Sequence, residues 1–239
     1  AIYTQKIDLV NNQKISFKGN YEKNAAGNYR LRSLYIGNTS ATTHDGSALF
    51  SSAYSDGVEF FDSFYINGGL RLNEKYTTAD DVEIPQIGDI VISALYTDDA
   101  LYYAKGNIDG SATELMNSKT SEVIGVTHLY DGRLRVEDGA IFEAKGGIQL
   151  HSSVTGKSTP TLYLRNSSLR GSTLLLEQGT LLELTGKNTA TFTTFQLDDS
   201  GSVTFHMNGG NADFAVLRLS GAFEQQGALT LNISFNDSE

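Results

Sequence analysis

The sequence predicts an all-β protein, and three observations support this fold class. Apolar and polar residues alternate over short runs such as Lys6–Val10 and Leu134–Val136, which is the period of a half-buried strand. The segments between these runs are rich in Ser, Thr, Asn and the 24 glycines, which are residues of turns. Only 2 prolines occur, as expected where strands need their backbone N–H groups. Helical spacing is confined to residues 77–85 and 111–119.

Residues 1–125 are expected to form a hairpin-rich β region. Lys6–Val10 and Lys14–Phe17 flank Asn11-Asn12, a pair that suits the positive φ angles of a tight turn. Further strands are expected at 29–32, 34–36, 90–92 and 101–103. The first half is therefore predicted to build its sheets mainly from neighbouring strands.

Residues 126–239 are expected to form a second, repeat-like β region. Short segments there share a pattern of alternating apolar residues, then polar residues with a Gly or Ser, then apolar residues again. The segments begin at residues 134, 162, 174, 195, 217 and 229, and the steps from 174 to 195 and from 195 to 217 suit a coil of two or three strands. Such a coil cannot bury its apolar face alone, so coils must stack as in a parallel solenoid.

The alternation predicts which side chains of this region point inward. They are Leu134, Val136, Leu162, Leu164, Leu174, Leu176, Leu197, Leu217, Leu219 and Leu231. The other gaps between segments are unequal, which leaves an alternative open. In that alternative, two β-sandwich or jelly-roll domains pack together, since strands 8–12 residues apart with turn signals also predict that fold.

The composition excludes several classes of protein. The net charge is −10 and the pI is about 4.8, which argues against a nucleic-acid partner because such proteins need basic patches. The absence of Cys excludes disulfides, thiolate zinc sites and Cys nucleophiles. No apolar run reaches the roughly 20 residues of a membrane-spanning helix, so no transmembrane segment is expected in this chain. Nucleotide-binding and zinc-peptidase motifs are missing, and no cofactor is expected.

Three segments of the second region carry a resemblance to a known family. LRVEDGAIFEAKGGIQL, LLLEQGTLLELTG and LSGAFEQQGALTLNI resemble the repeats of bacterial autotransporter passenger domains, and the likeness covers about residues 126–235. The resemblance implies a right-handed parallel β-helix, export to the bacterial cell surface or beyond, and an adhesin-like role. It implies no catalytic residue. We therefore expect an exported protein that binds host or matrix glycoconjugates, that is, a glycoprotein or a polysaccharide.

A dense aromatic stretch offers a candidate glycan-binding surface. Rings lie among carboxylates and amides there, a combination that suits the apolar faces and hydroxyls of sugars. If residues 60–65 form one strand, Phe60, Asp62 and Phe64 share one side and Tyr65 lies on the other. The alternative interpretation is that all the rings fill the core. The candidate ligand-binding residues are Tyr54, Asp56, Asp62, Tyr65 and Asn67.

The alternative function is an exported hydrolase acting on a glycoprotein such as mucin. Asp198 and Asp199 precede Ser200 and Gly201, which gives the Asp-Ser-Gly sequence of an aspartic peptidase loop. Such an enzyme needs two loops whose carboxylates share a proton, and a second copy is absent. A glycosidase needs two carboxylates at a defined separation, which sequence cannot select. The same residues also stand where the repeat expects a bend.

Two further groups are candidates for binding or chemistry. Asn208, Asn211 and Asp213 resemble half of a calcium-binding nonapeptide, with oxygen ligands that suit Ca²⁺, but only one copy occurs and Ala212 stands where Gly or Asn is wanted. The four histidines lack the sequence spacing of a metal pair, although His128 and His151 can meet across neighbouring strands.

Overall fold

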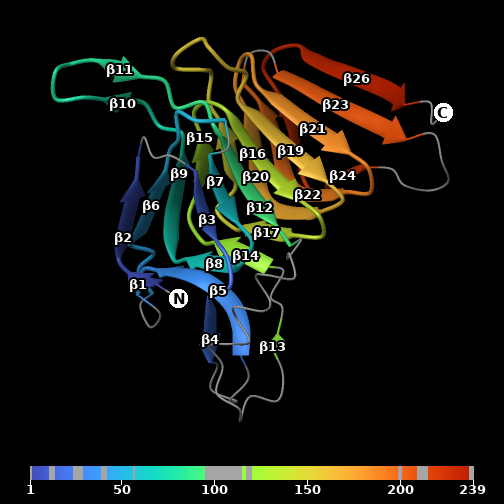
Figure 1. Ribbon diagram of the computed structural model, residues 1–239. Helices are drawn as coiled ribbons and strands as arrows, with labels where there is room; N and C mark the ends of the chain where they lie inside the picture. The colour runs from blue at the N-terminus through green and yellow to red at the C-terminus, as the bar shows by residue number, and fades with distance from the viewer. Residues whose placement is uncertain are drawn as a thin grey trace.

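A computed structural model describes residues 2–10, 14–23, 29–38, 42–55, 57–94, 115–116, 120–198, 201–208 and 215–236. Within these residues the protein is all-β (Figure 1), and none of them belongs to a helix that could cross a membrane. The strand pairs are parallel apart from two antiparallel pairs, β4 (Tyr21–Lys23) with β5 (Tyr29–Ile36) and β10 (Tyr76–Thr77) with β11 (Glu83–Ile84). Parallel pairing disagrees with the antiparallel sandwich alternative.

The strands form three stacks, which are named here in the order in which the chain visits them. Stack 1 contains β1 (Ile2–Thr4), β5, β8 (Ser63–Ile66), β14 (Thr120–Val123), β17 (Ile141–Ala144), the first halves of β20 (Ser168–Leu176) and β22 (Thr189–Leu197), and β24 (Val216–Leu219). Stack 2 contains β2 (Lys6–Leu9), β6 (Gly46–Phe50), β9 (Gly68–Leu72), β15 (Thr127–Leu129), β18 (Ile148–Leu150), the second halves of β20 and β22, and β25 (Phe223–Gln225).

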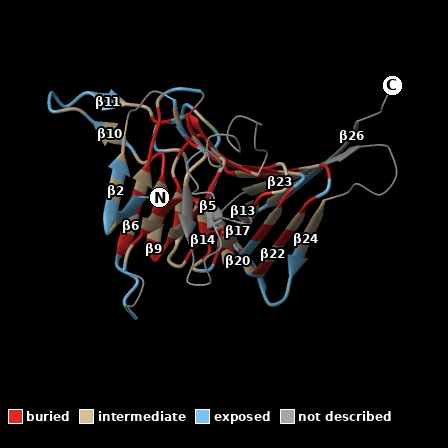
Figure 2. Ribbon diagram, turned by 60° about the horizontal axis from the view of Figure 1, so that its bottom comes forward, coloured by how far each residue is buried: buried red, intermediate tan, exposed pale blue. Residues whose placement is uncertain are grey.

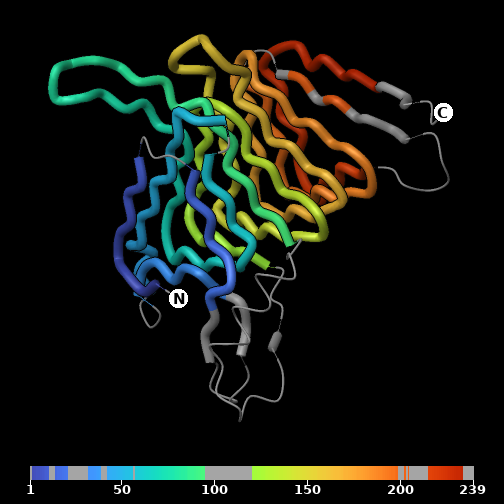
Figure 3. Tube along the Cα trace, in the orientation of Figure 1, coloured from blue at the N-terminus to red at the C-terminus, as the bar shows by residue number. Residues whose placement is uncertain are grey.

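Stack 3 is a separate sheet with its strands in sequence order. It contains β3 (Ile15–Phe17), β7 (Val58–Phe60), β12 (Asp89–Ser93), β16 (Arg133–Glu137), β19 (Thr161–Arg165), β21 (Leu181–Thr185), β23 (Gly201–Asn208) and β26 (Leu229–Asn236). The short β13 (Leu115–Met116) pairs with β5. After each strand of stack 3 before β26, the next strand of stack 1 follows, one position further along that stack, and Figure 3 shows the path of the chain. One passage through the three stacks is called a coil here.

Parallel register places apolar side chains in ladders between the stacks. One ladder of stack 3 runs through Val58, Ile90, Leu134, Leu162 and Leu182, each at most 1% exposed. Figure 2 shows that buried residues recur along the stacked strands. Seven of the residues expected to point inward are confirmed as buried: Leu134, Val136, Leu162, Leu164, Leu174, Leu176 and Leu197.

The remaining three lie in the last described coil. Leu217 packs partly against the core, whereas Leu219 is 37% exposed and Leu231 is 55% exposed. Their pairing places them in the ladders of Phe192 and Val203, so the alternation is as predicted. They are exposed because the described residues place no further coil against them.

Several local predictions for the first half are wrong. Lys6–Val10 and Lys14–Phe17 do not form a hairpin, because β2 pairs with β6 and β3 pairs with β7, both in parallel. Residues 77–85 form no helical turn but the β10–β11 pair, closed by a bond from Val82 N–H to Thr78 Oγ1. Of residues 111–119, only Leu115 and Met116 lie within the described part, as β13. β9 and β15, which lie on either side of residue 125, pair with each other in parallel.

A column of glycines marks the corner between stacks 1 and 2. A Cβ atom at Gly68 would lie 1.7 Å from the carbonyl oxygen of Gly46, and one at Gly125 would lie 2.6 Å from that of Gly68. A Cβ atom at Gly146 would lie 2.4 Å from the carbonyl oxygen of Gly125. The backbones of successive coils therefore touch at this corner, and only residues without a Cβ allow it.

Candidate functional site

The outer surface of stack 2 carries two rows of side chains in register. The first row lies on the strands and consists of Arg71, His128, Gln149, Leu175, Gln196 and Glu224. The second row follows the strand ends and consists of Tyr130, His151, Glu177, Asp198 and Gln226. We call both rows together the polar ledge.

Backbone hydrogen bonds hold the second row in line. His151 N–H donates to the Leu129 carbonyl at 2.9 Å, and Asp198 N–H donates to the Leu176 carbonyl at 3.0 Å. Tyr130, Glu177 and Gln226 make the same bond to the preceding coil. These residues point outward because they alternate with the buried Leu129, Leu150, Leu176 and Leu197.

Two histidines and a glutamate form a hydrogen-bonded chain across the ledge. His151 Nδ1 lies 2.8 Å from Glu177 Oε1, and His128 Nδ1 lies 2.9 Å from His151 Nε2. A carboxylate only accepts, so Nδ1 is the protonated nitrogen of His151 and its Nε2 accepts from His128 Nδ1–H. The chain therefore leaves Nε2 of His128 without a proton.

Aromatic stacking extends this chain. The Tyr130 ring lies 4.6 Å from the His151 ring at 13°, and 6.1 Å from the His128 ring at 20°. Burial lowers the pKa of His128 below 6.5, and the positive charge of Arg71 lowers it further, as would a proton added to His151. Burial together with Glu74 raises the pKa of Tyr130 above 10.0. Both rings are thus held in their neutral forms.

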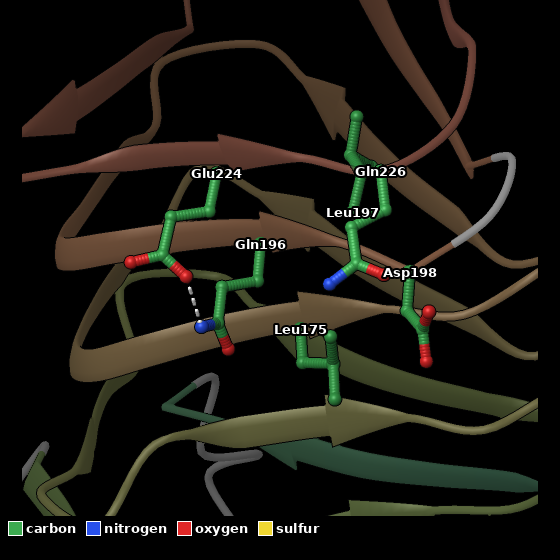
Figure 4. Close-up of a pocket in the computed structure, with 6 residues that line it drawn as sticks. All are labelled: Leu175, Gln196, Leu197, Asp198, Glu224 and Gln226. Atoms are coloured by element: carbon green, nitrogen blue, oxygen red, sulfur yellow. Dashed lines mark hydrogen bonds between the residues drawn. The ribbon is translucent and has the colours of Figure 1, made fainter.

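The ledge ends in a groove of about 300 Å³, shown in Figure 4. It is lined by Leu175, Gln196, Leu197, Asp198, Glu224 and Gln226 from three neighbouring strands. Gln196 Nε2 donates to Glu224 Oε2 at 2.5 Å. Figure 4 places the carboxylates of Glu224 and Asp198 toward opposite ends of the groove. An apolar Leu175 thus lies among amides and carboxylates whose hydrogen-bonding atoms face solvent.

The structure splits the aromatic stretch as the alternation predicted. Phe60 and Phe64 are 2% exposed and pack together in the core, whereas Tyr65 lies on the outer face of stack 1. There Tyr65 stacks on Tyr35 at 4.7 Å, and Tyr35 stacks on Tyr3 at 5.8 Å. Stacking along the row therefore covers the ring faces between neighbouring tyrosines.

The other candidates of that stretch do not gather around Tyr65. Tyr54 is 50% exposed in the segment after β6, and Asp56 lies outside the described residues. Asn67 is buried, donates to the Asn38 carbonyl and lies 2.7 Å from His44 Nδ1. A bend at residues 61–62 interrupts the alternation expected across 60–65.

Asp62 has a structural role in this arrangement. Its carboxylate is 2% exposed and accepts bonds from the Gly19 and Asn20 N–H groups and from Ser33 Oγ. Burial raises its pKa above 3.8, while these bonds act in the opposite direction. These hydrogen bonds hold Gly19 and Asn20, which follow β3, against β5 and the start of β8. The Asp62 carboxylate is therefore bound by the protein itself and does not face a ligand.

The candidate catalytic and calcium-binding residues are only partly visible. Asp198 is exposed on the rim of the groove, and Asp199 lies outside the described residues. Asn211 and Asp213 also lie outside them, as does the side chain of Asn208. In the part of the chain that the structure describes, no three His, Cys, Asp or Glu side chains gather as a metal site requires.

Sequence reasoning found one pair of this site and Asp198, which was named as a catalytic candidate, and missed the other residues. The meeting of His128 and His151 was expected, but the Tyr130 and Glu177 partners were not. The available signal was the position of each residue directly after an apolar alternation: Tyr130 follows Leu129, His151 follows Leu150 and Glu177 follows Leu176. Aligning strand ends, instead of strand starts, would have placed them in one row.

Comparison of the chain with protein-family models, with curated proteins and with solved structures found no match. The functional argument therefore depends on the geometry and chemistry of the ledge.

Proposed function

We propose that this chain is an exported, adhesin-like domain of a bacterial cell surface. Its three stacks correspond to a right-handed parallel solenoid, and it binds the neutral sugars of host or matrix glycoconjugates through the polar ledge. The groove around Leu175 carries this proposal. Successive in-register coils support it further, because they repeat similar contacts along one face.

The groove offers the two kinds of contact that a sugar ring needs. Leu175 supplies an apolar contact for the C–H face of a pyranose, and it is half-buried between strands. Gln196, Gln226 and Asp198 supply donors and acceptors for hydroxyl groups. A few directed polar groups around an apolar contact are the usual composition of a small-ligand site.

The charge of the ledge selects against anionic sugars. Glu177, Asp198 and Glu224 lie on neighbouring coils, and the whole chain carries a net charge of −10. These carboxylates repel sulfate and sialic acid groups, so neutral hexoses and N-acetylhexosamines are the ligands that fit.

A glycan array followed by titration calorimetry tests the proposal. Gln196→Ala removes a groove amide and its bond to Glu224, and is expected to weaken neutral-glycan binding by roughly tenfold or more. Gln5→Ala removes an exposed amide in the first coil and should leave binding unchanged. Because both changes delete the same side chain from the surface, their folding stabilities should stay close to wild type.

Other outcomes would replace the proposal. If Tyr65→Ala abolishes glycan binding while Gln196→Ala does not, the tyrosine row of stack 1 is the site. If the protein instead cleaves glycoprotein and Asp198→Asn abolishes that cleavage in a folded protein, the function is hydrolysis. Absence of binding to every neutral glycan on the array would contradict the proposal.

A further inference from the structure

The last described coil leaves apolar ladder positions open to solvent. Leu219, Phe223, Leu231 and Ile233 are 37%, 46%, 55% and 53% exposed. One or two coils inward, Phe192, Phe195, Leu182 and Leu184 occupy the same ladders at 0–2% exposed. Inward-pointing residues are therefore left uncovered at one end of the stacks, which is the kind of apolar patch that marks an interaction surface.

The backbone edges at this end are also free. Among the described residues, β24 pairs only with β22, β25 only with β22 and β26 only with β23. Their outer N–H and C=O groups face no described strand. A parallel edge of this kind pairs readily with another strand.

The opposite end has the matching arrangement. There β1, β2 and β3 each pair on one side only, with β5, β6 and β7, in the part of the chain that the structure describes. Figure 1 shows β2 and β26 at opposite ends of the molecule. Ile7, Leu9 and Ile15 are only partly buried against the core there, and Ile2 is 48% exposed.

From this match we propose that the face formed by β24, β25 and β26 docks on the face formed by β1, β2 and β3 of a second copy of this chain. Each end presents one free strand of stack 1, one of stack 2 and one of stack 3. A shift along the stacking direction therefore brings β24 against β1, β25 against β2 and β26 against β3. All three new pairs are parallel, like the pairs inside the protein.

The side chains agree with this register. Continuing the inner ladders places Leu231 and Ile233 against Ile15 and Phe17, and Phe223 against Ile7. Apart from Phe17, which is already buried, these contacts cover apolar groups that are exposed or half-exposed in the single chain.

One outer row agrees as well, because Arg218 continues the row of Tyr3, where a guanidinium over an aromatic ring is favourable. The other outer row opposes the contact, because Glu224 comes opposite Asp8 and like charges repel. Lys6, which lies 2.6 Å from the Asp8 carboxylate, offsets part of this repulsion.

Contact between two different faces of identical chains cannot close into a symmetric pair. Each added copy exposes the same free end again, so the assembly grows as an open line of copies. The expected solution behaviour is a mass that rises with concentration in multiples of the 25.9 kDa chain.

Analytical ultracentrifugation of two end-blocked variants tests this contact. Leu231→Lys with Ile233→Lys blocks one end, and Ile7→Lys with Leu9→Lys blocks the other, because an edge lysine opposes pairing. Each variant alone is expected to remain a monomer at concentrations where the wild type assembles. Mixing the two variants is expected to give dimers and nothing larger. Each variant has only one open face, and the mixed dimer uses both of them.

Three results would overturn the inference, provided circular dichroism shows folded variants. A wild-type chain that is monomeric up to high concentration excludes the contact. Dimers formed by one blocked variant alone indicate a symmetric contact between like ends. A mixture that stays monomeric while the wild type assembles places the interface elsewhere. None of these results depends on whether a glycan binds the ledge.

Discussion

His128 shows how neighbouring coils set the chemistry of a single residue. Its Nδ1–H is committed to His151, whose own Nδ1–H is committed to Glu177. An imidazolium at His128 would face the positive charge of Arg71, its neighbour in the first row. Burial opposes the charge too, and the folded protein therefore favours the neutral ring.

This preference predicts a pH dependence of stability. The folded pKa of His128 lies below the unfolded value near 6.5, so the unfolded chain binds the additional proton. Stability from this residue is present above about pH 6.5 and is lost as the pH falls below it. His128→Gln should therefore lose less stability than wild type in urea unfolding between about pH 7.5 and about pH 5.5. His44→Gln, an exposed histidine outside the ledge, is the control; equal slopes for His128→Gln and wild type would contradict the assignment.

At the residue scale, the alternation of side chains along a strand predicted which of them point into the core and which point outward. It placed Phe60 and Phe64 inside and Tyr65 outside, as the structure has them. It also placed Asp62 on the side of Phe60 and Phe64, but it could not predict what binds the buried carboxylate, because the donors come from Gly19 and Asn20. The groove at Leu175 likewise required the order of strands, which no single segment contains.

At the scale of elements, the glycine corner decides how closely two coils approach. Gly68 begins β9, and any Cβ there would enter the carbonyl of Gly46. The next residue, Gly69, has an open position, because a Cβ added there would lie 3.6 Å from its nearest neighbour, the Val126 carbonyl oxygen. The close approach of two coils therefore requires a glycine at position 68, whereas a Cβ atom at position 69 would make only an ordinary contact.

Alanine at these two positions gives a matched prediction. Gly68→Ala must push the coils apart, and we expect a loss of about 3 kcal/mol or more in the free energy of unfolding. Gly69→Ala reduces the freedom of the unfolded chain at a site without a clash, so its effect should stay within about 1 kcal/mol. Urea unfolding of both variants measures the difference. Equal stability of the two variants would show that the corner is not closely packed.

Elements also show why the first half was mispredicted. Asn11 and Asn12 gave a local hairpin signal between Lys6–Val10 and Lys14–Phe17, and such signals reflect only neighbouring residues. The actual partners, β6 and β7, lie about 40 residues away. In the second half, the segment starts at 134 and 162 belong to stack 3, whereas those at 174 and 195 belong to stack 2. The start at 217 belongs to stack 1 and the one at 229 to stack 3, so most of the unequal gaps arose from comparing strands of different stacks. The gap from 134 to 162 lies within stack 3 and reflects a longer coil.

At the scale of the whole molecule, burial depends on the position of a coil in the stacks. Leu182, Val203 and Leu231 occupy one ladder in three successive coils. Leu182 is 0% exposed and Leu231 is 55% exposed, although both have the same side chain and the same direction. Alternation predicted that direction for Leu231, but no pattern within a segment tells how many coils will cover it.

The same substitution at both ends of this ladder is the sharpest test of that dependence. Leu182→Asp places a carboxylate in the core without a partner and should cost about 4 kcal/mol, which is a large share of the stability of a typical domain. Leu231→Asp leaves the carboxylate in contact with water and should cost less than about 1 kcal/mol in the dilute single chain. Both values come from urea unfolding at a concentration where sedimentation shows monomers only. If Leu231→Asp were as damaging as Leu182→Asp, the last coil would be covered in the single chain, and the end faces proposed to join two copies would not be free.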